Sequence, residues 1–256
     1  MEQILEVTDL KMHFGGVKAV DGLSFYLSAN EFLGIIGPNG SGKTTVYNAL
    51  TGVYKPTAGK VVFLGRDITG EPMYNMVRFG LARTFQNLRS YRGMTALENV
   101  MMGYYINDKT NFFDALLHTP RFHRYEKESR ELAIECLKLV GMENMKDEYV
   151  GSMPYGMQKR IELCRALVTE PKMLLLDEPT AGLNSYEASK LIENVIYVKS
   201  QRSLAVIMIE HNMRVMMSAS DRVLAMDAGK LIAMGLPSEV QNNSLVIKAY
   251  LGEEKQ

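Results

Sequence analysis

The sequence predicts an α/β fold with a mainly parallel β-sheet, and three features lead to this prediction. Short apolar segments alternate with helical patterns, most regularly from residue 173 to residue 226, and this alternation is typical of parallel sheets covered by helices. A glycine-rich loop lies between the apolar segment 32–36 and a helical segment. A second apolar segment, 173–176, ends in two adjacent acidic residues.

The glycine-rich loop 37–44 fits the phosphate-binding pattern G-x-x-x-x-G-K-[ST] at every fixed position. Glycines let successive backbone N–H groups turn toward an anion, and the N-terminus of the following helix adds a partial positive charge. A glycine-rich turn that matches by chance is the alternative, and the flanking strand and helix argue against it. Lys43 is predicted to contact the β- and γ-phosphates, and the Thr44 hydroxyl is predicted to bind Mg²⁺. The residues predicted to bind the nucleotide are Gly37, Pro38, Asn39, Gly40, Ser41, Gly42, Lys43, Thr44 and Thr45.

The acidic pair Asp177 and Glu178 follows the apolar segment 173–176 directly. A buried carboxylate is costly unless it meets a cation or a hydrogen-bond donor. Asp177 is therefore predicted to reach the Mg²⁺ held by Thr44, and Glu178 to accept a proton from an attacking water. A solvated acidic turn is the alternative, and the phosphate-binding loop argues against it.

The remaining elements follow from periodicity and from breaker residues. Segments 4–10 and 23–27 alternate like half-buried strands, and from about residue 87 to residue 167 the pattern is helical, most clearly at 126–141. We predict a single domain over residues 1–256 with an inserted helical sub-domain at about 87–167. The other predicted elements are strands at 32–36, 61–64, 81–85, 173–177, 204–209, 222–226 and 231–234, and helices at 43–52, 72–79, 185–200 and 212–219.

Composition limits the class of protein. Lys plus Arg and Asp plus Glu both total 29, and this balance argues against a nucleic-acid partner, which would favour a basic excess. Cys136 and Cys164 lack the spacing of a metal site and are expected to pack in helices. The sequence shows no signal-peptide pattern and no apolar run approaching 18 residues, so a cytosolic location is expected.

The segment 152–167 lies between the phosphate-binding loop and the acidic pair, and here the chain resembles the ATP-binding subunits of ABC transporters. In that family a Leu-Ser-Gly-Gly-Gln signature opens a helix. This sequence keeps Gly156 but has Pro154 in place of the serine, with Tyr155 and Met157 at the flanking positions. Proline offers neither the serine hydroxyl nor a backbone N–H. The resemblance implies that Pro154, Tyr155, Gly156 and Met157 serve the ATP site of a partner cassette.

Further stretches are most similar to one branch of the family, the ATPases of branched-chain amino-acid importers. They are the segments 84–87, 95–100, 181–184 and 246–252. The resemblance covers essentially the whole chain. It implies a P-loop NTPase core of the ABC type, with an inserted helical sub-domain and an N-terminal antiparallel β portion, and with ATP and Mg²⁺ as substrate and cofactor.

The resemblance also implies roles for four single residues. Phe14 would stack on adenine, although an ordinary core phenylalanine is the alternative. Gln86 would reach the Mg²⁺ and the nearby water, and His211 would contact the γ-phosphate and help to place that water. Asn184 stands in the loop that links the two sites of a dimer, where the family has an aspartate, and its amide can hydrogen-bond but carries no charge.

The implied function is ATP hydrolysis that powers uptake of branched-chain amino acids across the cytoplasmic membrane. The expected partners are a second, different ATPase subunit, two membrane permeases and an external solute-binding protein. The chain would lie on the cytoplasmic face of the membrane. An importer of urea or short amides, or an exporter of lipid, is the alternative within transport. A soluble ABC ATPase of DNA repair or translation is disfavoured, because such proteins carry two cassettes or long insertions.

Overall fold

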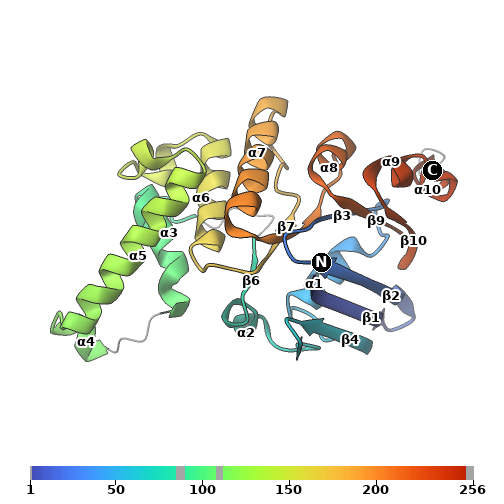
Figure 1. Cartoon of the computed structure of the whole chain (residues 1–256), viewed down its shortest axis with the longest axis horizontal. Helices are drawn as coiled ribbons and strands as arrows, with labels where there is room; N and C mark the ends of the chain where they lie inside the picture. Colours follow the sequence, from blue (N-terminus) through green and yellow to red (C-terminus); the bar gives the residue numbers. More distant parts are fainter. Residues whose placement is uncertain (1, 85–89, 108–111, 252–256) are drawn as a thin grey trace. The chain divides into compact units, whose positions relative to one another are not determined.

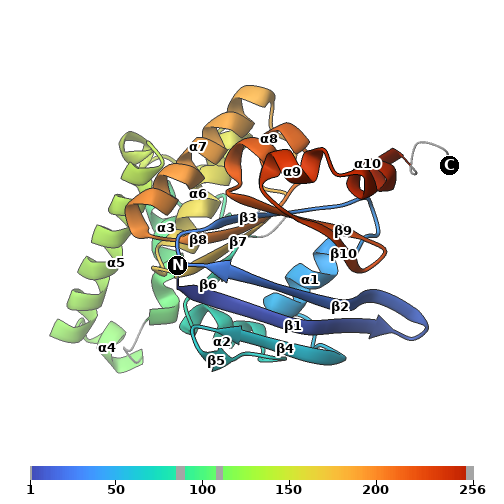
Figure 2. The same ribbon diagram turned by 45° about the vertical axis from the view of Figure 1, so that its right-hand side comes forward.

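The computed structural model describes residues 2–84, 90–107 and 112–251. These residues form two compact units. The first unit comprises the described residues of Met1–Arg83, Lys172–Pro179 and Lys199–Gln256, and the second those of Thr84–Pro171 and Thr180–Val198. Figures 1 and 2 show the elements of each unit.

A six-stranded sheet, formed by described residues, is the centre of the first unit, in the order β10-β9-β3-β8-β7-β6. Strands β9, β3, β8, β7 and β6 run parallel, and β10 pairs antiparallel with β9. Strands β9 and β10 form a hairpin, with positive φ at Ala228 and Gly229. The strands are β3 (Phe32–Ile36), β6 (Leu81–Arg83), β7 (Met173–Asp177), β8 (Ala205–Ile209), β9 (Arg222–Asp227) and β10 (Lys230–Gly235).

An antiparallel sheet in the order β2-β1-β4-β5 completes the first unit. Buried and exposed residues alternate along much of β1, which gives this sheet one buried face. That face shares an apolar core with Leu33 and Ile35 of β3 and with Val46 and Leu50 of the following helix. The strands are β1 (Gln3–Phe14), β2 (Val17–Ser28), β4 (Ala58–Phe63) and β5 (Arg66–Asp67).

Helices cover both faces of the six-stranded sheet, as expected for parallel strands that are buried on both sides. Helix α1 lies between this sheet and the antiparallel sheet, whereas α8, α9 and α10 lie on the opposite face (Figure 2). The helices of the first unit are α1 (Lys43–Leu50), α2 (Met73–Arg78), α8 (Met213–Ala219), α9 (Pro237–Gln241) and α10 (Ser244–Leu251).

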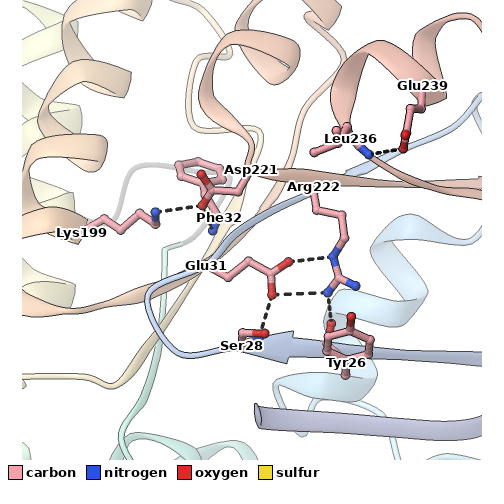
Figure 3. A network of polar contacts seen from close by, with 9 residues as sticks. All are labelled: Tyr26, Ser28, Glu31, Phe32, Lys199, Asp221, Arg222, Leu236 and Glu239. Carbon is pink, nitrogen blue, oxygen red and sulfur yellow. Dashed lines mark hydrogen bonds and ion pairs between the residues drawn. The ribbon is translucent and has the colours of Figure 1, made fainter. Parts of the chain in front are cut away.

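A partly buried ion pair joins the turn before β3 to the start of β9 (Figure 3). The carboxylate of Glu31 accepts from Arg222 Nε at 2.7 Å and from the Ser28 N–H at 2.7 Å. Arg222 also donates to the Tyr26 carbonyl at 2.6 Å and lies over the Tyr26 ring at 4.1 Å. Because the carboxylate and the guanidinium have several partners each, the cost of burying them is offset.

A second polar contact fixes the first residue of β3. Asp221 Oδ2 accepts from the Phe32 N–H and from Lys199 Nζ, each at 2.8 Å (Figure 3). These contacts and the Glu31–Arg222 pair hold both ends of the β2–β3 turn against β9. The strand that leads into the glycine-rich loop is therefore fixed before the loop begins.

The second unit is helical. Thr95 forms a capping box with Glu98 at the start of α3, and Thr119 caps α5, which begins at Pro120. Buried Cys164 donates from Sγ to the Cys136 carbonyl at 3.3 Å, so both cysteines pack between helices. The helices are α3 (Ala96–Tyr104), α4 (Phe112–Leu116), α5 (Pro120–Leu139), α6 (Tyr155–Leu167), most of α7 (Ser185–Arg202), and short 3₁₀ helices at Tyr105–Asn107, Glu143–Met145 and Val150–Ser152.

The structure extends the sequence prediction in two places. Strands β1 and β2 continue beyond the predicted 4–10 and 23–27, because their ends pair with each other in a long hairpin. Strand β5 and helices α9 and α10 were not predicted, since each is too short to show a clear period. Within the described residues, no helix is both long enough and apolar enough to cross a lipid bilayer.

Candidate functional site

The predicted phosphate and acidic motifs meet at one edge of the six-stranded sheet. Strands β3 and β7 both flank β8 and run parallel to it, with Ile35 and Asp177 each aligned with Ile209. Parallel strands place their carboxyl ends at the same edge. The glycine-rich loop after β3, Asp177 at the end of β7 and His211 just beyond β8 are therefore brought together within the first unit.

The glycine-rich loop is held by its own lysine and by the hairpin after β9. Buried Lys43 donates from Nζ to the Gly37 carbonyl at 2.6 Å and to the Pro38 carbonyl at 2.8 Å. The Ser41 N–H donates to the Pro38 carbonyl at 3.2 Å, and the Gly229 N–H donates to the Ser41 carbonyl at 3.0 Å. The loop is therefore a closed turn with the ammonium of Lys43 inside it.

Two glycines set the course of this loop. Gly37 has φ 154°, and a Cβ there would lie 2.2 Å from the Met226 carbonyl oxygen, so no other residue fits. Gly42 is left-handed, at φ 101°, and forms the N-cap of α1. The first N–H groups of α1 have no partner within a helix, which makes its N-terminus suited to an anion. Thr44, in this first turn, is exposed.

The Glu178 side chain contacts His211, the histidine predicted to reach the γ-phosphate. His211 Nε2 lies 2.7 Å from Glu178 Oε1, so with Glu178 ionised the imidazole carries its proton on Nε2 and donates it. Glu178 has φ 47°, unusual for a residue with a side chain, and its N–H donates to the Ile209 carbonyl at 2.9 Å. The Glu210 carboxylate accepts from the His211 N–H at 3.0 Å. The Glu178 and His211 side chains are thus held in contact with each other.

Asp177 is a half-buried carboxyl whose pKa is raised, first by burial and then by the negative charge of Glu178. The charges of Arg83 and His211 act in the opposite direction and lower its pKa. A cation beside Asp177 would stabilise the ionised form further. Carboxylate and hydroxyl oxygens are the donors that Mg²⁺ prefers, so Asp177 and Thr44 fit this metal chemically.

The rest of the predicted metal site is not made of acidic or imidazole groups. Among the described residues, no group of three or more His, Cys, Asp or Glu side chains is arranged to hold a metal ion. A Mg²⁺ that binds phosphate oxygens needs only one or two protein carboxylates, so it does not require such a group. Gln86, the third predicted ligand, lies outside the described residues.

Phe14 ends β1 and is 45% exposed, so it is not an ordinary core phenylalanine. Its ring meets the Tyr54 ring edge-on, with centroids 5.4 Å apart and an interplanar angle of 74°. An exposed, braced aromatic ring offers a flat apolar surface to another ring. In the glycine-rich loop, Asn39 and Gly40 are also exposed.

The signature residues lie in the second unit, at the start of α6. Exposed Pro154 is the N-cap, and its carbonyl accepts from the Met157 N–H at 3.0 Å. Tyr155 is 41% exposed. A Cβ at Gly156 would lie 2.9 Å from Glu187 Oε1, so the helix start packs closely against the Glu187 side chain. The helix therefore presents an N-terminus without a capping side chain.

Asn184 caps helix α7 in the second unit. Its Oδ1 accepts from the Glu187 N–H at 3.0 Å, and Glu187 Oε2 accepts from the Asn184 N–H at 3.2 Å. This reciprocal pair satisfies two backbone donors that the helix itself leaves unpaired. The side-chain oxygen of Asn184 is thus engaged within its own chain.

Replacing Asn184 with alanine is expected to lower the free energy of unfolding by about 1 kcal/mol, because the cap of α7 is lost. Asn184→Asp keeps an oxygen at the same place and is expected to retain most of that stability. Chemical denaturation of the two variants beside the unmodified chain measures the difference. Equal stability of the alanine variant and the unmodified chain would contradict the capping role.

Two residues outside the predicted site act on its members. Arg83 donates from Nη1 to Thr51 Oγ1 at 3.0 Å, and of the positive charges that lower the pKa of Asp177 its effect is the largest. Tyr250 accepts at its hydroxyl from the Gly37 N–H at 2.8 Å. No short motif contains either residue together with its partner, so only the folded chain reveals these contacts.

Comparison with known proteins identifies the family. A family model described as "ABC transporter" matches residues 20–181, and one described as "Branched-chain amino acid ATP-binding cassette transporter" matches residues 230–256. The high-affinity branched-chain amino acid transport ATP-binding protein BraF of Pseudomonas aeruginosa is 42% identical over 98% of both chains. The corresponding protein LivG of Salmonella typhimurium is 40% identical over 98% of this chain and 99% of its own.

Solved structures agree with these relatives. The crystal structure of the ADP conformation of an ATP-binding cassette of an ABC transporter is 30% identical, with a TM-score of 0.85 over 98% of this chain and all of the other. A nucleotide-free ATP-binding cassette gives a TM-score of 0.83 over 97% and 98% of the two chains. The predicted fold class, a P-loop core of the ABC type with an antiparallel N-terminal sheet, is confirmed. This chain belongs to the ATP-binding cassette family of ABC transporters.

Proposed function

We propose that this chain is the ATP-hydrolysing subunit of an importer for branched-chain amino acids. ATP hydrolysis is supported by one observation: the glycine-rich loop, Asp177 and the Glu178–His211 pair lie at the same edge of the sheet. Phosphoryl transfer to water requires bound phosphates, stabilised negative charge and a group that orients the water. Each requirement has a candidate residue within the first unit.

The chain's own residues divide these tasks. The loop N–H groups and Lys43 hold the phosphates, and the Gly37 and Pro38 carbonyls place Lys43 Nζ for this task. Glu178 accepts the proton of the attacking water. His211 Nε2 lies 2.7 Å from Glu178 Oε1, so His211 holds that carboxylate in place and would also contact the γ-phosphate. Phe14 stacks on the adenine ring with its exposed face.

Mg²⁺, when bound, neutralises charge that develops on the β- and γ-phosphate oxygens. Thr44, Asp177 and Gln86 are the residues that would hold it. Arg83 adds a positive charge that lowers the pKa of Asp177 against the effect of burial, which favours the ionised carboxylate that a metal ligand must be.

Assembly is proposed from the position of the signature in the second unit. Pro154, Tyr155, Gly156 and Met157 would face the γ-phosphate held by a partner cassette, and the Asn184 loop would lie at that interface. We propose one ABC ATPase domain over residues 1–256 with a helical sub-domain at about 87–167. The partners would be a second, different ATPase, two permeases and an external binding protein, with this chain peripheral on the cytoplasmic face of the membrane.

The solute class rests on the relatives. The names of two full-length relatives at 40–42% identity specify branched-chain amino acid transport, and a model of that description matches residues 230–256. Solute specificity lies in other subunits. Solute specificity is therefore tested on the assembled transporter that contains this chain.

Proteoliposomes that hold this chain, its partner ATPase and the permeases are expected to take up leucine, isoleucine and valine when ATP is on the side of the ATPases and the binding protein is on the other. Uptake of labelled leucine, with urea and acetamide as rival solutes, measures this. The isolated chain is expected to hydrolyse ATP slowly and with a rate that rises with its concentration, because each site needs a second cassette.

Two results would overturn the proposal. Uptake of urea or acetamide with no uptake of branched-chain amino acids would reject the solute class. Full ATPase turnover by a chain shown to be monomeric would reject the shared site.

A further inference from the structure

Helix α10 belongs to the same unit as the glycine-rich loop, although it lies near the other end of the chain. Buried Val246 anchors it, and the Asn243 side chain accepts from the Leu245 N–H at 2.9 Å at its start. The preceding helix α9 is fixed in turn by Glu239, which accepts from the Leu236 N–H at 2.9 Å (Figure 3). Helix α10 is thus held in place by packing and by hydrogen bonds at its start.

One polar group of helix α10, the hydroxyl of Tyr250, contacts the glycine-rich loop. The Tyr250 hydroxyl oxygen accepts from the Gly37 N–H at 2.8 Å, a contact between residues 213 positions apart in the sequence. Tyr250 is half-buried and Gly37 is buried. This hydrogen bond stabilises the folded chain, because a buried N–H without a partner costs free energy.

The carbonyl group of Gly37 contacts Lys43, the lysine predicted to bind the phosphates. The Gly37 carbonyl accepts from Lys43 Nζ at 2.6 Å. The Met226 carbonyl oxygen, 2.2 Å from where a Cβ would be, closes the third side of Gly37. Gly37 is therefore fixed by two hydrogen bonds, from its N–H to Tyr250 and from Lys43 to its carbonyl, and by close packing of its α-carbon against β9.

We propose that Tyr250 is a positioning residue for ATP binding. Its hydroxyl fixes Gly37, and Gly37 in turn places the ammonium of Lys43. The C-terminal helix α10 thereby sets the affinity of the loop for the polyphosphate of a nucleotide. A preorganised loop loses less conformational freedom on binding than a loose one. The inference rests on the proposed binding of ATP at this loop.

The test is Tyr250→Phe, which removes only the hydroxyl oxygen, with Tyr186→Phe on the exposed surface of α7 as the matched control. The dissociation constant for ATP is measured by titration calorimetry at a temperature where all chains are folded. One neutral hydrogen bond corresponds to about a two- to tenfold change in an equilibrium constant. Tyr250→Phe is therefore expected to weaken ATP binding by that factor, and Tyr186→Phe to leave it unchanged.

A double-mutant cycle tests the path through Lys43. If Tyr250 acts by placing Lys43, the loss caused by Tyr250→Phe is expected to shrink to less than about twofold in a Lys43→Met background. In the assembled transporter, Tyr250→Phe is expected to raise KM for ATP and leave kcat unchanged. A purely structural role would lower the unfolding temperature without this split between KM and kcat.

Three outcomes separate the possibilities. An ATP dissociation constant that Tyr250→Phe leaves unchanged overturns the positioning role. Equal losses in the two backgrounds overturn the path through Lys43. An unmodified chain that does not bind ATP would instead reject the proposed function itself.

Discussion

Glu178→Gln is expected to reduce ATP turnover of the assembled transporter on the order of 100- to 10,000-fold, the range that a general base contributes. Glutamine keeps the shape of the side chain and an oxygen that can accept from His211, but it cannot take up the proton of the attacking water. ATP binding is expected to stay within about twofold, because no phosphate contact is removed. Steady-state phosphate release and equilibrium ATP binding measure the two quantities separately.

The position of Glu178 makes this expectation specific. Its backbone has φ 47° and its carboxylate lies 2.7 Å from His211 Nε2, and such a conformation persists only where the surroundings hold it. Glu6→Gln, at an exposed position of β1, is the matched control for loss of one carboxylate. Near-normal turnover of the Glu178→Gln transporter would remove Glu178 from the role of base.

The second large effect is expected in binding. Lys43→Ala is expected to weaken the affinity for ATP by about ten- to 150-fold, the value of one hydrogen bond to a charged group. The ammonium of Lys43 lies inside the loop on the Gly37 and Pro38 carbonyls, where it faces any phosphate that the loop binds. Titration of the purified chain with ATP measures the loss.

Lys60→Ala is the control for removal of a lysine, because Lys60 lies on β4 and its side chain is 60% exposed. It is expected to leave ATP affinity unchanged. The contrast with Glu178→Gln is also informative: one variant is expected to bind but not turn over, the other to bind poorly. An unchanged affinity of Lys43→Ala would show that the ammonium does not contact the bound phosphates.

Much of the candidate site was predictable because its parts are short and continuous in sequence. The loop 37–44 carries its own strand, turn and helix start, and Asp177 and Glu178 close an apolar strand. The alternation of strands and helices from residue 173 onward likewise indicated the parallel order that the sheet has. Local motifs of this kind are determined by backbone geometry and by apolar periodicity, both of which a single sequence displays.

The contact between Glu178 and His211 was predictable only in part. Glu178 directly follows the predicted strand 173–177, and His211 lies two residues after the predicted strand 204–209. That β7 and β8 are neighbours, with Asp177 aligned with Ile209, is a property of the sheet. Asn184 shows a similar limit. Its position in a loop was evident, whereas its hydrogen bond to the Glu187 N–H depends on where α7 begins.

The sequence by itself determined the family, the phosphate-binding loop and the acidic pair, because each depends on residues that are adjacent in the chain. Only the tertiary structure decided that Tyr250 holds the N–H of Gly37, that the charge of Arg83 opposes the rise in the pKa of Asp177, and that Glu31 and Arg222 brace the strand before the loop. These groups are far apart along the chain and share no motif. Hydrogen bonds and Coulomb interactions act over a few ångströms of space, so packing of the sheet and its helices decides which of them form.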